Sequence, residues 1–487
     1  MKRKKHARKI KPKKQIIPFI ILGVMILAYV AFFSIISIDR HDHFQSLAFD
    51  LGIYDQAIWK FSRFAGGFNT VRGIEIFGDH FTPINLLIAP LYWFTDDVRA
   101  LLVLQTLAFA LSAVPLFFIA YHYLKSRWAS LAVCFSLLMF PAMHYVNLED
   151  FHPESFILLF VLCAFYFLIK KKYPLYMLFV VLALMCKEEV ALTMFLVGIY
   201  VFFRHSKKYG LITSGLAVAW FLIAVLVVAP HFNGYKYLYS GYLLGQFGEK
   251  PLEIAGNLVN PAKVLPVVFN SANGKFMLDL FGPVAFLSLL GPLLLLPCAA
   301  LWMNIITSWP YSHNIYYHYV VAIIPFVFLS LASGLGWLRK KSRKACNILL
   351  VVLVIAAVIG SYYFAPYDSS IKNYQHIASK LGNFNIMTSH EQEIYSMLDM
   401  IPKNASVSAR YDLLPHLTHR NEIYNFPNPF KAHYWGTWTT EPPLVYVDYI
   451  FITGNELRDY NETLSTILPR YNLLSSDQDV FLYQRKQ

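Results

Sequence analysis

Long apolar runs recur along most of this chain, and they constrain its fold more than any other feature. The first run begins at Gln15, and further runs follow as far as residue 364. An α-helix needs about 20 apolar residues to cross the roughly 30 Å hydrocarbon layer of a bilayer. With 57% hydrophobic and 15% charged residues, the 487-residue chain carries more apolar surface than a soluble core of this length uses. The sequence therefore predicts a polytopic α-helical membrane protein.

Basic residues at the N-terminus predict how the chain is oriented. Nine of the first fourteen residues are Lys or Arg, and no small-residue cleavage site of a signal peptide follows them. Because Lys and Arg collect on the cytoplasmic side of membrane proteins, we expect residues 1–14 to form a cytoplasmic tail. This placement accounts for the net charge of +13 without nucleic acid, which we do not expect as a partner.

Further basic clusters divide the chain into segments that cross the membrane an even number of times. They lie at Lys125 and Arg127, at 170–172, at 204–208 and at 339–344. If every cluster is cytoplasmic, about eleven crossings follow and the C-terminus lies outside. We expect the crossings near residues 15–38, 97–123, 128–146, 153–169, 211–229, 276–290, 291–306, 317–337 and 345–364, with two short helices meeting at "KEE" between 173 and 204.

The composition changes after the last apolar run and predicts a second domain. Residues 15–366 form the membrane domain, with a first outer loop at 39–96 and a long outer segment at 231–275. From residue 367 the sequence is polar, with alternating runs such as "ASVSAR" and "VYVDYIFIT" around a predicted helix near Tyr411 to His419. Alternation of this kind is typical of half-buried strands. We predict a small extracytoplasmic α/β domain over 367–487.

Acidic residues and histidines gather in five short motifs, all of which the threading places at the outer face. They are "FDLGIYDQ" (49–56), "GDHFTP" (78–83), "EDFHPE" (149–154), "KEE" (187–189) and "SHNIYYHY" (312–319). A charged group at membrane depth costs about 2.5–3.5 kcal/mol, so charges beside apolar runs are candidates for function. The alternative is that these loops are simply polar.

The first motif has the pattern of an interfacial helix over residues 47–61. Asp50 stands at the start of this helix, where it either caps the helix or has a chemical role. Asp55 lies on the opposite, wetter side, where we expect it to be solvated. The apolar stripe that would lie on the bilayer consists of Leu47, Leu51, Tyr54, Ile58 and Phe61.

The second and third motifs each have a structural and a functional interpretation. Asp79 and His80 either form an ordinary turn or hold a cation or a phosphate. Glu149 and Asp150 precede Pro153, so they are either ordinary carboxylates at the start of a helix or part of a metal or phosphate site. The sequence contains no HExxH or CxxC pattern, so the spacing alone is a weak metal signal.

The last two motifs add positive charge and aromatic rings. Lys187 lies between apolar runs, where it either forms a buried ion pair with Glu188 or binds a phosphate as a point charge. His318 and Tyr319 open a predicted crossing at the outer face. An outer-face site with these groups suits a substrate that carries a lipid-anchored phosphate.

Transfer of a sugar from such a phosphate makes two chemical demands. A carboxylate must take the proton of the acceptor hydroxyl, and positive charge or a metal must stabilise the leaving phosphate. Asp50 or an acidic residue of "EDFHPE" meets the first demand, and Lys187 and His80 meet the second. The sequence has no Gly-rich phosphate loop, in agreement with a donor that is not a nucleotide.

Several separated motifs resemble a family of bacterial and archaeal membrane proteins catalogued only as a domain of unknown function. They are "FDLGIYDQAIW", "GDHFTPI", "LLVLQTLAFALSAVPLF", "EDFHPE", "KEEVAL" and "YYHYVVAIIPF", and they cover most of the chain. That family in turn resembles the C superfamily of membrane glycosyltransferases (GT-C), such as the dolichyl-phosphate-mannose and aminoarabinose transferases. The resemblance implies a GT-C-like architecture with outer interfacial helices and a soluble outer domain.

The same resemblance implies roles for particular residues. In GT-C enzymes the first outer loop opens with a catalytic Asp followed by Glu, with Tyr four residues after the Asp. Asp50 and Tyr54 match this pattern, whereas Leu51 stands where Glu is usual. The second acidic position of those enzymes falls at Glu149 or Asp150, and Lys187 corresponds by analogy to a contact with the donor phosphate.

We expect a plasma-membrane glycosyltransferase that moves a sugar from a polyprenyl-phosphate donor to an extracytoplasmic acceptor, a cell-envelope glycan, lipid or protein. Its partners are membrane lipid, the lipid-linked sugar and the acceptor, and a divalent metal (Mg²⁺ or Mn²⁺) is an open option. The alternatives are a transporter or lipid flippase, and a catalytically inactive sensor or assembly protein. The candidate catalytic residues are Asp50 and Asp150, and the candidate binding residues are Tyr54, Asp55, Gln56, Asp79, His80, His152, Glu154, Lys187, Glu188, His318 and Tyr319.

Overall fold

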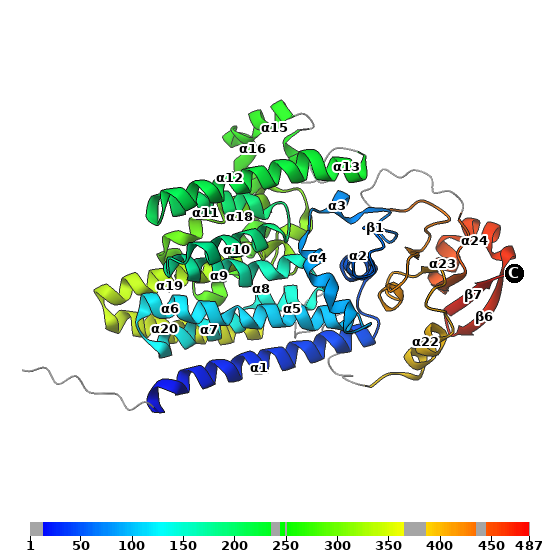
Figure 1. The fold of residues 1–487 in the computed structure, drawn as a ribbon, viewed down its shortest axis with the longest axis horizontal. Helices are drawn as coiled ribbons and strands as arrows, with labels where there is room; N and C mark the ends of the chain where they lie inside the picture. Colours follow the sequence, from blue (N-terminus) through cyan, green and yellow to red (C-terminus); the bar gives the residue numbers. More distant parts are fainter. Residues whose placement is uncertain (1–12, 235–243, 249–250, 365–385, 435–444, 487) are drawn as a thin grey trace, which may run out of the picture.

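The chain folds into a helical part and a C-terminal part that contains a β-sheet (Figure 1). The computed structural model describes residues 13–234, 244–248, 251–364, 386–434 and 445–486. The helical part runs from α1 (Lys13–Asp42) to α20 (Arg343–Phe364), and the C-terminal part begins at α22 (Ser389–Asp399). Between them lie the short elements of the first loop (Figure 1).

Four helices among the described residues are long and apolar enough to cross a membrane. They are α1, the continuous pair α5 (Arg99–Leu111) and α6 (Ala113–Leu124), the segment Lys207–Asn233 that contains α12 (Lys207–Ile223) and α13 (Ala229–Asn233), and α20. The pair α7 (Arg127–Leu138) and α8 (Pro141–Leu148) adds a fifth if its 44° bend lies within one span. The number of crossings predicted from the sequence, about eleven, therefore stays a prediction.

The remaining apolar runs form shorter helices, and one prediction about them is wrong. Helices α9 (Phe156–Ile169), α10 (Tyr173–Leu184) and α11 (Val190–Arg204) form as expected, and α10 and α11 meet at "KEE". The expected crossings at 276–290 and 291–306 are not continuous helices: α17 (Ser271–Phe281) and α18 (Cys298–Ile306) are separated by three short 3₁₀ turns. Pro283, Pro292 and Pro297 interrupt the helix because proline has no N–H to donate. Helix α19 (Ile324–Lys341) also begins later than expected.

Small residues bring two of the helices into close contact. Helices α11 and α12 pack side by side, and a Cβ atom added at Gly210 would lie 2.3 Å from the backbone nitrogen of Phe202. A Cβ atom at Gly198 would lie 2.6 Å from the backbone nitrogen of Ser214. Because these glycines allow the backbones to approach, a larger residue at either position would push the two helices apart.

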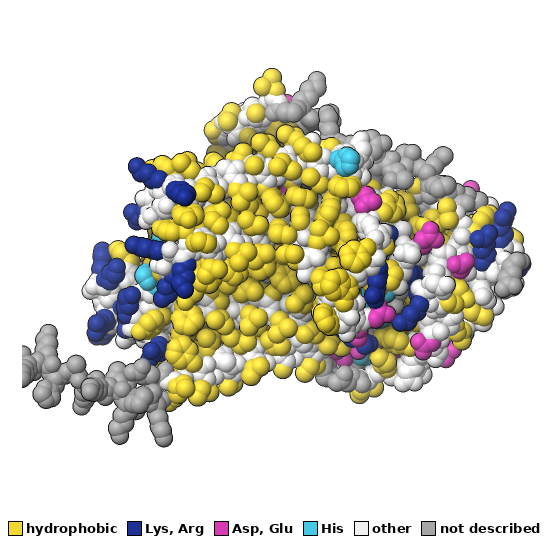
Figure 2. Space-filling model, in the orientation of Figure 1, with side chains coloured by type: hydrophobic (Ala, Val, Ile, Leu, Met, Phe, Trp, Pro, Cys, Tyr) yellow, Lys and Arg dark blue, Asp and Glu magenta, His cyan; other side chains and the backbone are white. Residues whose placement is uncertain are grey.

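The charged residues divide between the two ends of the helical part. A broad hydrophobic face covers the helices, with Lys and Arg side chains at the end far from the C-terminal part (Figure 2). The basic clusters predicted to be cytoplasmic lie at the ends of α6, α9, α11 and α19 or at the starts of the helices that follow them. Acidic side chains in this view lie mainly toward the C-terminal part (Figure 2).

The C-terminal part contains a five-stranded mixed sheet in the order β4-β3-β5-β7-β6. The strands are β3 (Val407–Ala409), β4 (Ile423–Asn425), β5 (Tyr449–Thr453), β6 (Tyr471–Asp477) and β7 (Val480–Arg485). Strand β3 is parallel to both β4 and β5, whereas β7 is antiparallel to β5 and β6. Helices α22, α23 (Gly454–Asp459) and α24 (Asn461–Ile467) complete the predicted α/β character.

The predicted helix near Tyr411 to His419 is shorter than expected. Only Leu414–Leu417 forms a 3₁₀ turn. The hydroxyl of Thr418 donates to the carbonyl of Pro415 at 3.1 Å, and the Arg420 side chain donates to the carbonyl of Leu417 at 2.6 Å. In a longer helix these carbonyl groups would accept hydrogen bonds from backbone N–H groups. Because side chains donate to them instead, the turn ends there.

The C-terminal part packs directly on the loop that carries the first motif. Helix α2 (Ile53–Ser62) is buried on both faces, and a Cβ atom at Gly52 would lie 2.7 Å from the side chain of Leu414. The backbone nitrogen of Ala48 donates to the carbonyl of Tyr411 at 2.8 Å. The expectation that residues 47–61 form a helix with one wet face is therefore wrong, because a segment more than 350 residues later in the chain covers that face.

Candidate functional site

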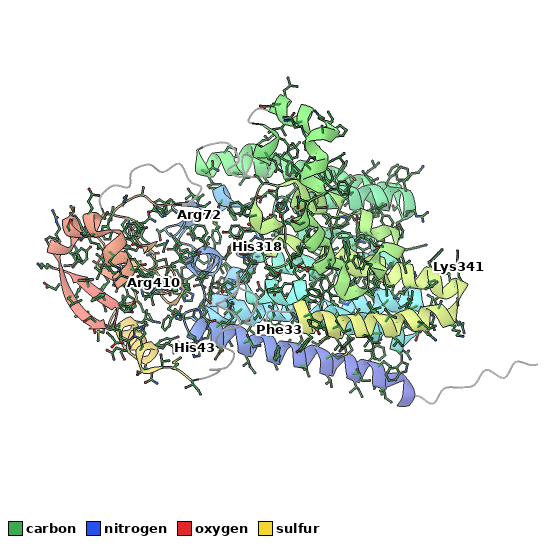
Figure 3. The ribbon with its side chains drawn as sticks, turned by 180° about the vertical axis from the view of Figure 1, so that it is seen from behind. Phe33, His43, Arg72, His318, Lys341 and Arg410 are labelled. Carbon is green, nitrogen blue, oxygen red and sulfur yellow. The ribbon has the colours of Figure 1, made fainter. Side chains whose placement is uncertain are left out.

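A cavity of about 800 Å³ lies where the helical part, the first loop and the C-terminal part meet. Figure 3 places Arg72 and His318 in this region and Lys341 at the opposite end of the molecule. All five motifs contribute to the cavity wall, so the structure brings together segments separated by more than 260 residues. Among its lining residues are Asp50, Tyr54, Asp79, His80, Glu149, Asp150, Lys187, Glu189, His318 and Tyr319, and the C-terminal part adds Tyr411, Asn425 and His433.

Asp50 stands at a sharp kink at the edge of this cavity. Its backbone has φ 65° and ψ −89°, within the short irregular turn Ala48–Gly52 that precedes α2. No side chain caps α2, so the interpretation of Asp50 as a helix cap is wrong. One carboxylate oxygen lies 3.2 Å from Nε2 of His152, and the side chain remains 37% exposed. The kink thus presents the carboxylate to the cavity.

Asp150 holds the Asp50 segment in place. Its Oδ2 accepts a hydrogen bond from the backbone nitrogen of Leu47 at 2.9 Å, and its Oδ1 lies 3.8 Å from a guanidinium nitrogen of Arg40. Burial raises the pKa of Asp150 to about 6, although Arg40 and the Leu47 N–H oppose the rise. Because both oxygens face these partners, the arrangement favours a positioning role over a catalytic one.

Gln105, which the sequence analysis did not single out, fixes the loop on which Asp150 and His152 lie. Its amide nitrogen donates to the carbonyl of Asp150 at 2.7 Å, and its oxygen accepts from the backbone nitrogen of His152 at 2.8 Å and from the hydroxyl of Ser155 at 2.8 Å. Gln105 is fully buried in α5. A lone amide within the apolar run of α5 was the available signal.

Glu149, His152 and His318 form a compact group with the donor atoms of a metal site. The rings of His152 and His318 stack with centroids 4.1 Å apart, and Nδ1 of His318 lies 3.5 Å from Oε1 of Glu149. One ligand atom from each residue lies within 4.8 Å of the other two. Within the described part of the chain, Oε2 of Glu149, Nδ1 of His152 and Nδ1 of His318 have no hydrogen-bond partner.

The two histidines of this group differ in charge. Burial disfavours the charged form of His152, but the carboxylates of Asp50, Glu149 and Glu154 outweigh it and raise its pKa to about 10. Burial lowers the pKa of His318, and the neighbouring charge of His152 lowers it further. The positive charge of the pair therefore lies on His152, beside Asp50.

Lys187 projects into the cavity from the break between α10 and α11. Its ammonium lies 2.7 Å from Oε1 of Glu154, and both side chains are 3% exposed. Burial disfavours the Lys187 charge, but Glu154 and the neighbouring Glu189 and Glu188 raise its pKa. The ammonium also lies 5.7 Å from the ring centroid of Tyr319. Glu154, and not the expected Glu188, is the closest carboxylate.

Glu188 instead joins the break to the first loop. Its carboxylate lies 2.9 Å from Nδ1 of His80 and accepts from the backbone nitrogen of Phe81 at 3.0 Å. Next to it, Asp79 accepts two hydrogen bonds from Arg72 at 2.9 and 3.0 Å. Burial opposes protonation of His80, but Glu188 raises its pKa. These pairs place two more basic side chains, His80 and Arg72, along the cavity wall.

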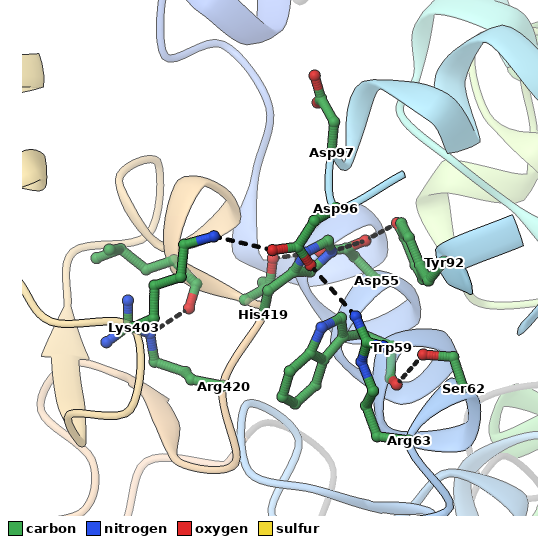
Figure 4. Close-up of polar contacts among 12 residues, drawn as sticks. Asp55, Trp59, Ser62, Arg63, Tyr92, Asp96, Asp97, Lys403, His419 and Arg420 are labelled. Carbon is green, nitrogen blue, oxygen red and sulfur yellow. Dashed lines mark hydrogen bonds and ion pairs between the residues drawn. The ribbon is translucent and has the colours of Figure 1, made fainter. Parts of the chain in front are cut away.

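Asp55 and Gln56 do not reach the cavity. Asp55 is fully buried, accepts hydrogen bonds from Tyr92 and Thr418, and lies 3.2 Å from Nε2 of His419 (Figure 4). The amide nitrogen of Gln56 donates to Thr70 at 2.7 Å and to the carbonyl of Arg420 at 3.3 Å. The expectation that Asp55 is solvated is wrong, because the C-terminal part covers it.

Comparisons with known proteins identify the fold and the family. None of the curated proteins matches the sequence. The crystal structure of ArnT from Cupriavidus metallidurans bound to undecaprenyl phosphate is similar with a TM-score of 0.53 at 10% identity, over 95% of this chain and 97% of that chain. The same protein in the apo state gives a TM-score of 0.48 at 9% identity over the same shares. The first similarity indicates a shared membrane fold, in agreement with the GT-C resemblance of the motifs. The chain belongs to the family described as "Predicted membrane protein (DUF2079)", which matches residues 40–472.

Proposed function

We propose that this protein is a glycosyltransferase that moves a sugar from a polyprenyl-phosphate donor to an acceptor outside the cytoplasm. The observation that carries the proposal is the Asp50 carboxylate, held by a kinked backbone at the edge of a large cavity that also contains Lys187. A base and a phosphate-binding cation in one cavity are the two groups that this transfer requires. The similar fold of ArnT, whose crystal structure contains undecaprenyl phosphate, supports a lipid-phosphate donor.

The wall of the cavity suits the two ends of such a donor. Apolar and aromatic side chains from the region of α18 line one side, including Ala300, Met303, Trp309 and Tyr317. This side would receive the first isoprene units. Lys187 would hold the phosphate, and its ammonium would exchange part of its interaction with Glu154 for the phosphate oxygens.

In the proposed reaction Asp50 acts as the base. Its carboxylate accepts the proton of the acceptor hydroxyl while that oxygen forms a bond to C1 of the sugar. The bond between C1 and the phosphate oxygen breaks, and polyprenyl phosphate leaves with the bonding electrons. Asp150 and Gln105 hold the loops of Asp50 and His152 so that the base need not reorganise during transfer.

The second carboxylate of the GT-C pattern has no counterpart at position 51. Leu51 is fully buried in the hydrophobic core, so its side chain does not contribute to the cavity. Glu149, His152 and His318 offer a different set of ligands for a divalent cation, which would displace the proton of His152 on binding. Two imidazoles and one carboxylate suit Zn²⁺ better than Mg²⁺, which prefers oxygen ligands. A bound cation would supply positive charge near the leaving phosphate.

We further propose that the cavity faces the outside of the plasma membrane. The basic clusters lie at the far end of the helical part, and basic residues collect on the cytoplasmic side. The cavity lies at one end of the helices, whereas a transporter binds its substrate near the middle of the bilayer. This position favours an enzyme over a transporter or flippase.

The proposal is tested with purified full-length protein and a labelled polyprenyl-phosphate sugar. We expect release of polyprenyl phosphate with the wild type and with Asp459→Asn, which removes an exposed carboxylate that does not line the cavity. Asp50→Asn should reduce the rate by about 10²–10⁴, the usual contribution of a general base. If Asp50→Asn turns over as fast as the wild type, Asp50 is not the base.

Two further measurements examine the metal and the orientation. Elemental analysis should find about one divalent cation per wild-type chain and a clear loss in His318→Ala. Single cysteines near the "KEE" break should react with a membrane-impermeant thiol reagent applied from outside the cell. Labelling from the cytoplasmic side alone would contradict the proposed orientation.

A further inference from the structure

A second, smaller cavity lies between the C-terminal part and the segment after α1. It has a volume of about 360 Å³ and is lined by His43 and Gln45 from that segment and by Arg410, Asp412 and Asp479 from the C-terminal part. Figure 3 labels His43 and Arg410 on the two sides of this junction. Its volume lies within the range of small-ligand sites, about 300–1,000 Å³.

The sheet topology places this cavity where α/β sheets bind ligands. Strand β3 lies between β4 and β5 and is parallel to both, so the chain order reverses between β3 and β5. Ligands of open α/β sheets bind outside the carboxyl ends of the strands at such a reversal. Arg410 directly follows β3 and Thr453 ends β5, and both line the cavity.

A buried polar side chain, Gln45, lies in the wall between the two cavities. Gln45 is only 5% exposed, and within the described residues its Oε1 has no hydrogen-bond partner. Gln45 lines both cavities, so the second cavity adjoins the cavity of Asp50.

The charges around the cavity indicate the class of ligand. Arg410 supplies donors, while Nε of its guanidinium lies 3.1 Å from the carboxylate of Asp412. Asp479 adds an acceptor whose side chain is 62% exposed, and His390 is held by Asp477 at 2.6 Å. Three carboxylates line the cavity, those of Glu391, Asp412 and Asp479, and they disfavour an anion. The abundance of polar groups disfavours an apolar molecule. A molecule with several hydroxyl groups can both donate and accept here.

We propose that this second cavity binds a saccharide unit of the acceptor. The identification of the saccharide as part of the acceptor rests on the proposed glycosyltransferase function. The binding itself does not, because it needs neither a donor nor turnover. One sugar unit would occupy the second cavity, and the rest of the acceptor would extend toward Asp50 in the adjoining cavity.

The test measures saccharide binding to the full-length protein in detergent without any donor. The probes are N-acetylglucosamine, methyl mannoside and methyl glucoside, with inorganic phosphate as a chemically different probe. Saturation-transfer NMR detects the weak binding that single sugars give. We expect at least one sugar to bind, and we expect Arg410→Gln and Asp479→Asn each to raise its Kd about tenfold or more.

Asp459→Asn is the matched control, because it removes an exposed carboxylate of the C-terminal part outside the cavity. Its Kd should equal that of the wild type. Asp479 lies in an exposed turn, so Asp479→Asn remains informative if Arg410→Gln does not fold. The proposal is overturned if no sugar binds, if phosphate binds in place of sugars, or if the control weakens binding as much as the two variants.

A comparison of the two assays separates this proposal from the proposed function. Sugar binding that depends on Arg410 and Asp479, in a protein that does not transfer sugar, would refute the glycosyltransferase and leave the saccharide site standing. Transfer by Asp50 without such binding would refute the saccharide site alone.

Discussion

Asp55 joins the two parts of the molecule, and its replacement provides a stringent test of the structure. Its carboxylate accepts a hydrogen bond from Tyr92 of the first loop (Figure 4). It accepts another from Thr418 of the C-terminal part. His419 lies between Asp55 and Asp96, with its ring nitrogens 3.2 and 2.9 Å from the two carboxylates. We predict that Asp55→Asn weakens the docking of the C-terminal part without a change in side-chain volume.

The magnitude follows from the burial of these groups. Asp55 is fully buried, and the side chain of His419 is 16% exposed. Hydrogen bonds to a charged group contribute about 1.5–3 kcal/mol each, and removing one partner of a buried ion pair costs about 3–5 kcal/mol. Since Asn keeps one acceptor oxygen, we expect a loss of about 3 kcal/mol. A loss of this size raises the fraction of molecules in which the C-terminal part is detached from the first loop about a hundredfold.

Hydrogen exchange measured by mass spectrometry reports this population. Peptides that cover α2 and the segment after β3 should exchange about a hundredfold faster in Asp55→Asn than in the wild type. Lys403→Ala is the comparison, because Lys403 contacts Asp96 at 3.0 Å but is 90% exposed. Loss of this exposed contact should destabilise the docked state by less than about 1 kcal/mol, so the exchange rate should rise less than about fivefold. Equal exchange in the two variants would refute the assignment of Asp55 to the junction.

Four further predictions concern pH, an ion pair and the kink. Burial lowers the pKa of His416 to about 3, so the unfolded state binds a proton first and stability should fall from about pH 6.5 to 3. In His416→Phe this fall, measured by thermal unfolding, should be smaller, and an equal fall would contradict the argument. Burial opposes protonation of His419, but Asp55 and Asp96 raise its pKa, so its stabilisation is complete below about pH 6.5 and disappears at higher pH. The difference in melting temperature between the wild type and His419→Gln should therefore shrink as the pH rises. Lys187→Met should destabilise the protein by about 3–5 kcal/mol, whereas Lys187→Met with Glu154→Leu should restore melting but not donor binding. Asp50→Gly should be more stable to heat than Asp50→Ala by about 1–2 kcal/mol, because position 50 has a positive φ.

Features that depend on neighbouring residues in the sequence could be predicted. The apolar runs identify the helical part. The rule that basic residues collect on one side of a membrane predicts that the basic clusters lie at the same end of it. Both signals follow from composition along the chain. The predicted membrane topology places the five motifs at the same face, and in the structure all five line one cavity. The signal for the interrupted helix, Pro283, Pro292 and Pro297, is present in the sequence, but the hydrophobicity of the run by itself predicts two continuous crossings.

Features that depend on distant contacts could not be predicted. Helical periodicity places Asp55 on a polar face, but only the fold reveals that Thr418 and His419 cover this face. In the same way, Lys187 and Glu188 are adjacent in sequence, yet the turn between α10 and α11 directs Lys187 to Glu154 and Glu188 to His80. A sequence motif thus identifies which residues gather, and the backbone of each loop decides their partners.

The backbone is strained at both Asp50 and Asp150, a feature that the sequence motifs do not reveal. Asp50 and Asp150 both have positive φ, at 65° and 82°, a conformation that costs a non-glycine residue about 1–3 kcal/mol. The hydrogen bond from the backbone nitrogen of Leu47 to Asp150 connects the segment of Asp50 with that of Asp150. Gln105 in turn holds the segment of Asp150 through its carbonyl group. Asp150 acts through its side chain in this connection, whereas the carboxylate of Asp50 faces the cavity. Backbone strain persists only where the surrounding structure maintains it. Here these contacts maintain it at Asp50, whose carboxylate the proposed reaction requires.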